Sequence, residues 1–303
     1  MADGRVLAVV GPTATGKSDL AVALAQRLDG EVINADSMQL YAGMDIGTAK
    51  LPSAERGGIE HHLLDIWPIT KSAAVAEYQV LARLAIAAIH DRGKVPIMVG
   101  GSGLYLRGAL DHLEFPGESP VIRRRLYTEL AELGPAALHA RLAEQDPLAA
   151  AAILPTNGRR VVRALEVIEL TGRPFTARMP GFESVYDTVQ IGLDRADLDE
   201  RVAQRVHRMM ALGLVDEIRG LLPAGLRESP TAGKALGYAQ LLAVLDESGA
   251  VVGDLDDAIE QTIRATRRFV RRQRSWFRRD PRVHWLDGTD DGLVEAALST
   301  LEL

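Results

Sequence analysis

The chain has 303 residues, of which 47% are hydrophobic and 25% are charged, a composition typical of a soluble globular protein. It contains no cysteine, which excludes disulfides, thiolate zinc sites, iron–sulfur clusters and cysteine nucleophiles. The first residues lead directly into a short apolar segment, and no apolar run is long enough to span a bilayer. We therefore expect a cytoplasmic protein without a signal peptide or membrane span.

The formal net charge of −6 conceals a basic segment near the C-terminus. Residues 264–282 contain nine arginines and one acid, a local charge of +8, so the rest of the chain carries −14. An acidic body with one concentrated basic segment indicates a specific site for a polyanion.

The first part of the chain alternates between strand and helix patterns. Strands are predicted at residues 5–10, 31–35, 62–66 and 95–99, and helices at 17–28 and from 75 to about 93. Alternation at this spacing is typical of right-handed βαβ units, so a parallel sheet is expected.

After about residue 112 the pattern becomes helical. A strand follows at residues 189–193, then several helices and a last strand at 283–286. We therefore predict an α/β fold, with a phosphate-loop NTPase-like parallel sheet and C-terminal helices in a core of residues 1–117 and 186–303. A helical insertion domain at 118–185 interrupts this core.

A complete phosphate-loop motif, Gly-x4-Gly-Lys-Ser, stands between the first predicted strand and the first predicted helix. Its glycines let successive backbone N–H groups surround phosphate oxygens, and the helix N-terminus adds partial positive charge. Lys17 can reach the outer phosphate, and the Ser18 hydroxyl can bind Mg²⁺. A diphosphate or triphosphate is predicted to bind to the motif, which consists of Gly11, Pro12, Thr13, Ala14, Thr15, Gly16, Lys17 and Ser18.

Two more segments follow predicted strands at the edge where ligands of α/β proteins bind. Asp36 follows the second strand and is either a proton acceptor for an attacking nucleophile or the N-cap of a helix. Residues 100–103 form a second glycine-rich turn. It is either only a tight turn, or it allows a ligand to approach closely with the Ser102 hydroxyl directed into the site.

A metal site formed by His61, His62 and Asp65 is a further possibility. No other histidine or acid stands at ligand spacing, so we favour structural hydrogen bonds for the two histidines. Asp65 could instead contact Mg²⁺ through water, as strand-end acids do in phosphate-loop enzymes.

Seven segments of the chain, taken in order, resemble the tRNA dimethylallyltransferase (tRNA isopentenyltransferase) family. They are residues 11–18, 34–41, 61–66, 99–105, 159–167, 234–238 and 272–277. The segments span nearly the whole chain, and the second, fourth and fifth are the most specific. The zinc finger of eukaryotic members is absent, consistent with the lack of cysteine and with a bacterial enzyme.

The resemblance implies transfer of a dimethylallyl group from its diphosphate to N6 of the adenosine 3′ to the anticodon, with Mg²⁺ as cofactor. It implies that Asp36 accepts a proton from the N6 amine, and that Thr13, Lys17 and Ser18 hold the diphosphate. Arg205 matches an arginine that clamps the diphosphate, and Ser102 stands where the family more often has Thr. The positions that match tRNA-contacting segments are Asp36, Ser37, Met38, Gln39, Ser102, Arg123, Arg159, Arg160, Val161, Val162 and Arg163.

The arginines of the basic segment recur at helical spacing, with aromatic residues between them. Guanidinium groups suit RNA phosphates, and aromatic rings can stack on bases. The alternative is a solvated helix face that the aromatic residues anchor. Our candidate tRNA contacts here are Arg267, Arg271 and Arg274, and a second stripe consists of Arg201, Arg205 and Arg208.

Three other functions remain open at this point. The chain could prenylate free adenine nucleotides (an adenylate isopentenyltransferase), phosphorylate a small molecule as a kinase, or bind nucleotide and RNA without catalysis. The insertion and the arginine-rich helix favour a tRNA substrate over a free nucleotide. We expect a monomer whose partners are the tRNA anticodon stem-loop and dimethylallyl diphosphate.

Overall fold

The structure is a computed structural model that describes residues 4–175 and 181–301. It divides into two compact units, which are treated separately below. Unit 1 consists of Met1–Asp111 and Phe182–Leu303, and unit 2 of His112–Gly181.

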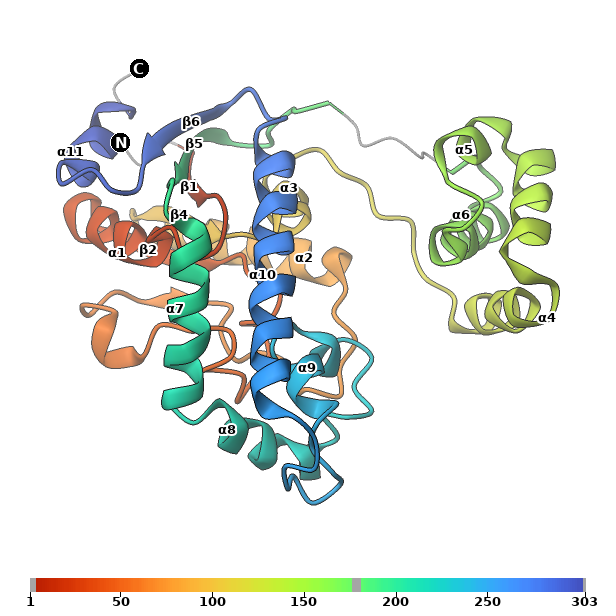
Figure 1. The fold of residues 1–303 in the computed structure, drawn as a ribbon. Coiled ribbons are helices and arrows are strands. Elements are labelled where there is room, and N and C mark those ends of the chain that lie inside the picture. The colour runs from red at the N-terminus through yellow and green to blue at the C-terminus, as the bar shows by residue number, and fades with distance from the viewer. Residues whose placement is uncertain (1–3, 176–180, 302–303) are drawn as a thin grey trace. The chain divides into compact units, whose positions relative to one another are not determined.

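Unit 1 is built on a six-stranded sheet with the strand order β3-β2-β4-β1-β5-β6 (Figure 1). The strands are β1 (Arg5–Val10), β2 (Gly30–Asn34), β3 (His61–His62), β4 (Val95–Gly100), β5 (Asp187–Asp194) and β6 (Val283–Asp287). Every pairing of these strands is parallel, which confirms the predicted sheet.

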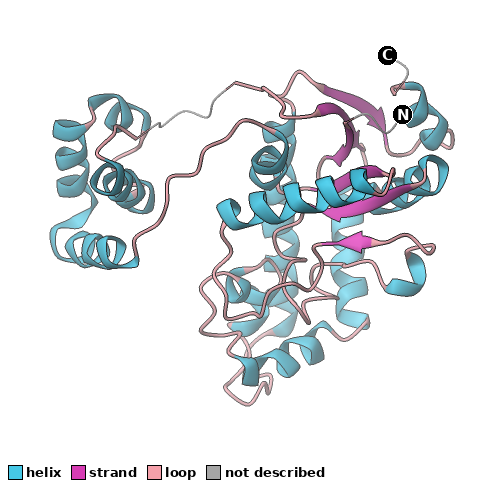
Figure 2. Cartoon of the chain, turned by 180° about the vertical axis from the view of Figure 1, so that it is seen from behind, coloured by secondary structure: helices cyan, strands magenta, loops and turns pink. Residues whose placement is uncertain are grey.

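Helices cover both faces of the sheet, as Figure 2 shows. The residues of β1 alternate between two apolar cores. Leu7 and Val9 belong to the core with α1 (Lys17–Leu28) and α11 (Leu293–Ser299). The intervening Val6, Ala8 and Val10 belong to the core with α2 (Val75–Asp91) and α3 (Gly103–Leu110). A strand with both faces buried must be apolar throughout, and this accounts for the continuous apolar run in the sequence.

The C-terminal part of unit 1 adds helices beyond the carboxyl ends of the strands. They are α7 (Leu198–Ala211), α8 (Leu214–Leu221), α9 (Tyr238–Leu242) and α10 (Leu255–Phe277), with 3₁₀ turns η2 (Leu222–Ala224) and η3 (Ala232–Lys234) between them. A further 3₁₀ turn, η1 (Ser53–Glu55), lies between β2 and β3. Helices α7 and α10 lie side by side (Figure 1) and share a small core that includes Val202, Val206, Ile263 and Val270.

Unit 2 is helical and has a core of its own. Its helices are α4 (Pro120–Gln145), α5 (Pro147–Ala152) and α6 (Gly158–Thr171). Gly134 has φ +80° and is followed by Pro135, so α4 is interrupted there. Buried leucines of α4 pack against Val161 and Leu165 of α6.

The boundaries of unit 2 differ from the predicted insertion at 118–185 at both ends. At its end, Phe182 lies under the guanidinium groups of Arg107 and Arg282 in unit 1, and Arg282 also donates to the Ser184 hydroxyl. At its start, the carbonyls of Pro116 and Gly117 accept hydrogen bonds from Arg163. Proline positions alone could not reveal these contacts.

The third strand is shorter than predicted. The pattern predicted residues 62–66, but the chain leaves the sheet after His62 because Leu63 and Asp65 have φ of +61° and +58°. Both are left-handed conformations that no strand contains. No helix within the described ranges is long and apolar enough to cross a membrane.

Candidate active site

The phosphate loop joins β1 to α1 at the carboxyl edge of the sheet. Gly11 has φ +129°, and a Cβ at this position would collide with the backbone of Leu193 on the neighbouring strand β5. Gly16 has φ +93° and directly precedes α1. Both glycines are therefore required by the backbone. The Thr15 hydroxyl donates to the Pro12 carbonyl at 3.0 Å and closes the loop from within.

Lys17 is the cation of this loop, and its ammonium donates to the Pro12 carbonyl. Burial and the nearby guanidinium of Arg205 lower the pKa of Lys17 to about 7, while the carboxylate of Asp36 opposes this shift. An anion bound in the loop would favour the protonated, positively charged form of the lysine. The free loop therefore holds a lysine that is poised to become fully charged when a phosphate arrives.

Asp36 lies just beyond β2, beside the loop. Its Oδ1 accepts from the Met38 N–H at 2.9 Å, and its own N–H donates to Asn34 Oδ1 at 2.9 Å. Residues 37–40 form turns, so the alternative that Asp36 caps a helix is wrong. The carboxylate fixes an Asx turn through one oxygen, which leaves the second oxygen for chemistry.

Ser102 holds the glycine-rich turn after β4 against the loop after β2, which contains Asp36 and Ser37. Its hydroxyl accepts from the Ser37 N–H at 3.1 Å and lies 3.3 Å from the Ser37 hydroxyl. The close approach predicted for the glycines of this turn is made by the protein itself. A Cβ at Gly101 would collide with Gln273, and one at Gly103 with Trp276.

Two arginines of α7 reach this edge of the sheet. Arg201 donates to the Ala14 carbonyl of the phosphate loop at 2.9 Å, and Arg205 donates to the Thr48 carbonyl at 3.3 Å. Burial and the charge of Arg201 lower the pKa of Arg205, whereas Asp36 raises it. Lys17 and Arg205 therefore lie near the Asp36 carboxylate, and Arg201 lies near Arg205. This arrangement is suited to a multiply charged anion.

The residues present fit a magnesium ion beside the loop. Ser18 is the second residue of α1, the position from which phosphate-loop proteins bind Mg²⁺ through a hydroxyl. In the described part of the chain, nothing hydrogen-bonds to the Ser18 hydroxyl, so this oxygen is available. The described part of the chain contains no group of three or more His, Asp or Glu that could hold a metal by themselves.

The hydrogen bonds predicted for the two histidines are confirmed. A ring nitrogen of His61 lies 2.9 Å from the Ile59 carbonyl, and one of His62 lies 2.7 Å from the Glu31 carboxylate. Asp65 pairs with the buried ammonium of Lys50, which also bonds to Asp45. This ion pair accounts for Asp65 without a metal.

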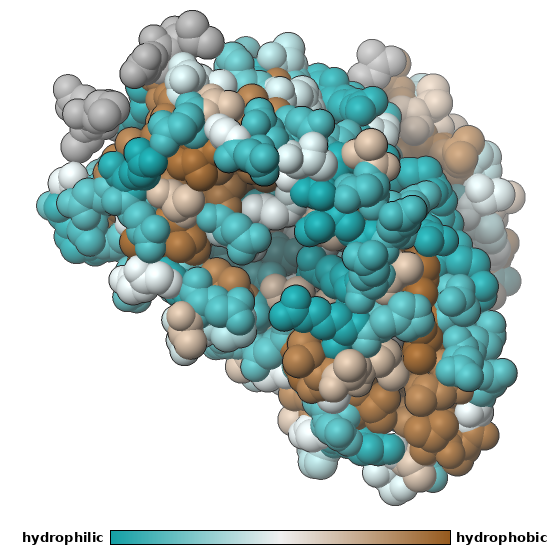
Figure 3. Space-filling model, turned by 60° about the vertical axis from the view of Figure 1, so that its left-hand side comes forward, coloured by the Kyte–Doolittle hydropathy of each residue, from teal (hydrophilic) through white to brown (hydrophobic). Residues whose placement is uncertain are grey.

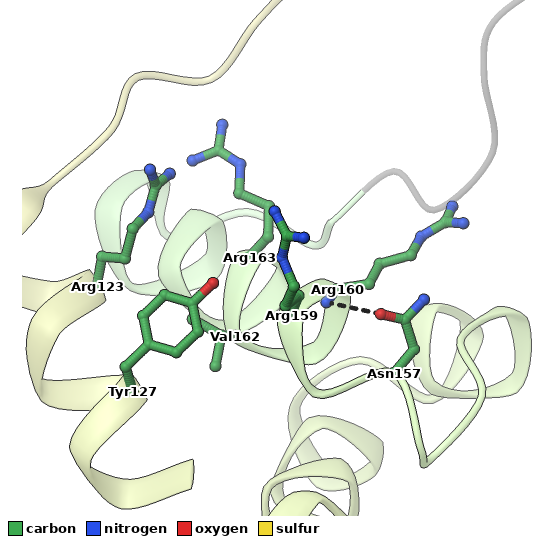
Figure 4. A pocket seen from close by; sticks show the side chains of 7 residues that line it. All are labelled: Arg123, Tyr127, Asn157, Arg159, Arg160, Val162 and Arg163. Atoms are coloured by element: carbon green, nitrogen blue, oxygen red, sulfur yellow. Dashed lines mark hydrogen bonds between the residues drawn. The ribbon is translucent and has the colours of Figure 1, made fainter. Parts of the chain in front are cut away.

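Most of the predicted tRNA-contacting residues of unit 2 surround one pocket of about 460 Å³, shown in Figure 4. Its lining consists of Arg123, Tyr127, Asn157, Arg159, Arg160, Val162 and Arg163. Arg123 and Arg163 both pair with the buried carboxylate of Glu166. Burial raises the pKa of Glu166, but the hydrogen bonds from Arg123, the Ser119 N–H and Arg163 outweigh burial and hold it below its usual range.

Two of the predicted tRNA contacts face the interior of unit 2. The side chains of Val161 and Val162 are almost fully buried in its core. They anchor α6 and direct the neighbouring arginines outward, and the tRNA contact of segment 159–163 stays a prediction.

The arginines of α10 divide into exposed and occupied ones. Arg271 is exposed, and among the described residues Arg267 donates only to the backbone carbonyl of Asp199. Arg274 pairs with Asp194 at 2.8 Å and donates to the Arg195 carbonyl, so it holds α10 to the end of β5. Arg274 therefore has a structural role, and the tRNA contacts of Arg267, Arg271 and Arg274 stay predictions.

Sequence reasoning missed two residues that organise the site. Gln273 of α10 bonds to both glycine-rich loops. The carboxylate of Glu217 accepts from the backbone N–H groups of Asp45, Ile46 and Gly47, and so shapes the loop whose Thr48 carbonyl holds Arg205. No motif marks Glu217, while Gln273 lies inside one of the family segments.

The face of the molecule that carries α1 and α7 is hollowed near its middle, and the surface around the hollow is mostly hydrophilic (Figure 3). A parallel sheet with a phosphate loop after its first strand, an acid after its second and basic residues above the carboxyl edge defines a phosphate-loop enzyme that acts on a phosphorylated compound.

Comparisons with known proteins identify the family. The family model described as IPP transferase matches residues 39–280. A tRNA dimethylallyltransferase of Streptomyces avermitilis is 66% identical over 295 residues, 96% of this chain and 93% of the relative. One of Streptomyces coelicolor is 68% identical over 94% of this chain and 90% of the relative. The chain belongs to the IPP transferase family.

Solved structures support the same assignment. A tRNA isopentenylpyrophosphate transferase of Bacillus halodurans is 40% identical, with a TM-score of 0.72 and coverage of 99% of this chain and 97% of that one. A eukaryotic dimethylallyltransferase acting on tRNA is 28% identical, with a TM-score of 0.81 and coverage of 99% and 78%.

Proposed function

We propose that this enzyme transfers the dimethylallyl group of dimethylallyl diphosphate to N6 of the adenosine 3′ to the anticodon of tRNA. The products are N6-(dimethylallyl)adenosine and diphosphate. The observation that carries the proposal is the position of Asp36 beside a phosphate loop, at the sheet edge that Arg205 and Ser102 also reach. The relatives named above are tRNA dimethylallyltransferases, which supports the choice of both substrates.

The reaction exchanges a C–O bond for a C–N bond and moves one proton from nitrogen to oxygen. The N6 nitrogen attacks the allylic carbon, the C–O bond to diphosphate breaks with its electron pair leaving on oxygen, and the N6 proton moves to the Asp36 carboxylate. The amine is a weak nucleophile because its lone pair is delocalised into the adenine ring, so a positioned base is required. The adenosine must also leave its base stack to enter the site.

The negative charge that develops on the leaving diphosphate is stabilised by fixed positive groups. Lys17 and the loop N–H groups bind it from one side, and Arg205 acts from α7. A magnesium ion held by Ser18 would neutralise further charge on the diphosphate oxygens. All these groups come from one chain, and we propose that the enzyme acts as a monomer.

A single assay tests the proposed function. The protein is incubated with labelled dimethylallyl diphosphate and Mg²⁺, together with either unmodified tRNA or AMP, and label on adenine is measured. Label on tRNA supports the proposal. Label on AMP alone would make the protein an adenylate prenyltransferase, and ATP turnover without label would make it a kinase.

The pKa of Lys17 predicts that diphosphate binding takes up a proton. At about pH 8 a lysine with a pKa of about 7 is mostly neutral in the free protein, and bound diphosphate favours its charged form. The affinity for inorganic diphosphate should therefore fall as the pH rises above 7. Calorimetry in buffers of different ionisation enthalpy measures the uptake. The Lys17→Met variant, as control, should lack this part of the uptake; equal uptake in both proteins would contradict the assignment.

Arg271, which is exposed, and Arg267, which is partly exposed, predict a salt-dependent contact between α10 and tRNA. The double variant Arg267→Ala, Arg271→Ala should bind tRNA more weakly and lower the salt slope by about 2, roughly one for each lost phosphate contact. Arg27→Ala, an exposed arginine of α1, serves as the control. An unchanged slope in the double variant, measured by filter binding at several salt concentrations, would exclude the role.

A further inference from the structure

Gln273 connects the two glycine-rich loops of the site. Its side chain is 5% exposed, although it lies on the arginine-rich helix α10. Oε1 accepts from the Thr13 N–H at 3.0 Å, and Nε2 donates to the Gly101 carbonyl at 2.9 Å. Both halves of one amide are thus used, each on a different loop.

The two loops hold opposite parts of the reaction. Thr13 belongs to the phosphate loop, which carries the leaving group in the proposed function. Gly101 precedes Ser102, whose hydroxyl accepts from the Ser37 N–H next to Asp36. The contact is close as well as polar, since a Cβ at Gly101 would collide with the Gln273 amide.

We propose that Gln273 is a positioning residue that sets the distance between the bound diphosphate and the base Asp36. This inference rests on the proposed function. Neither substrate needs to touch Gln273, so its loss should leave both affinities nearly intact. The step that requires leaving group, nucleophile and base in register should slow instead, because a displacement of about 1 Å at a reacting centre can cost roughly 10²-fold in rate.

The first test compares two glutamines of the same helix. Gln273→Met preserves length and removes both hydrogen bonds. Gln261→Met changes an exposed residue whose side-chain amide donates to Asp257 within α10. With both substrates saturating, we expect the single-turnover rate of Gln273→Met to fall by about 30-fold or more. The dissociation constants for inorganic diphosphate and tRNA should change by less than about threefold, and Gln261→Met should match the unmodified enzyme.

The second test uses the chemistry of the amide. In Gln273→Glu an ionised carboxylate can still accept from Thr13 but cannot donate to the Gly101 carbonyl. A protonated carboxyl can do both, and burial favours the protonated form. The rate of Gln273→Glu relative to the unmodified enzyme should therefore rise about tenfold as the pH falls from about 8 to about 6. A residue that only filled space would show no such rescue.

The results separate this inference from the proposed function. If the unmodified enzyme labels tRNA but Gln273→Met retains its single-turnover rate, or loses rate only through weaker diphosphate binding, the inference is overturned and the function stands. If circular dichroism shows that Gln273→Met does not fold, the pH profile of Gln273→Glu decides, and a constant ratio overturns the inference. If the unmodified enzyme transfers no label, the proposed function itself fails.

Discussion

Replacing Asp36 with alanine should lower the rate of dimethylallyl transfer by roughly 10²–10⁴, the usual contribution of a positioned general base. Diphosphate affinity should change little, because Lys17, Arg201 and the loop N–H groups remain. Asp36→Asn is the sharper variant. It keeps an oxygen to accept from the Met38 N–H, and so keeps the turn, but it cannot take a proton from the amine.

Single-turnover transfer and diphosphate binding, measured on both variants, distinguish the roles of Asp36. Slow transfer by Asp36→Asn with normal diphosphate binding identifies the carboxylate as the proton acceptor. A normal rate in Asp36→Asn together with loss of both properties in Asp36→Ala would show that the residue only shapes the loop.

Replacing Arg205 with glutamine should slow transfer by about 10²–10³, comparable with the loss of one preorganised donor to a developing anion. The effect is large because Arg205 is partly buried among charged groups of the site, where its charge is less screened than at the surface. Arg208, one turn along the same helix, is exposed and serves as the matched control.

For Arg205→Gln we expect both a lower kcat and weaker binding of diphosphate, whereas Arg208→Gln should stay within about threefold of the unmodified enzyme for both. Steady-state kinetics with saturating tRNA measure the two quantities. Equal losses in the two variants would mean that α7 contributes only a general positive field, and that Arg205 has no specific place at the diphosphate.

The sheet could be predicted because neighbouring residues in the sequence determine its strands and the first helix. The helix Lys17–Leu28 was predicted at both ends, since a phosphate-loop glycine precedes it and leucines repeat every four residues along it. Strand β1 was predicted because a strand buried on both faces must be apolar. The motif residues Lys17, Asp36 and Ser102 meet because parallel strands place their carboxyl ends at one edge.

Predictions failed where a distant partner decides the outcome. Strand β3 ends at His62, earlier than predicted, because Lys50 binds Asp65 and Asn34 donates to the Leu63 carbonyl. The ion pair of Arg274 was not predicted, because its partner Asp194 stands 80 residues away in the chain. Such pairings depend on the tertiary fold, and neither spacing nor composition encodes them.

The same reasoning explains why Gln273 escaped attention. The sequence around Gln273 is typical of a solvated helix, because the glutamine stands between arginines. Its burial results from the position of α10 over the two loops. For Gly101 and Gly103, the sequence predicted room for a ligand. They make room for side chains of α10.

Arg282 joins the two points at which the chain leaves and re-enters unit 1. It binds the buried carboxylate of Asp111 and the hydroxyl of Ser184, and residues 111 and 184 themselves form an antiparallel bridge. These contacts hold together the two chain segments of unit 1 between which unit 2 is inserted. Because the entropy of closing a loop grows only slowly with its length, an insertion held at such a junction can lengthen, shorten or be exchanged during evolution at little cost to the fold beneath it.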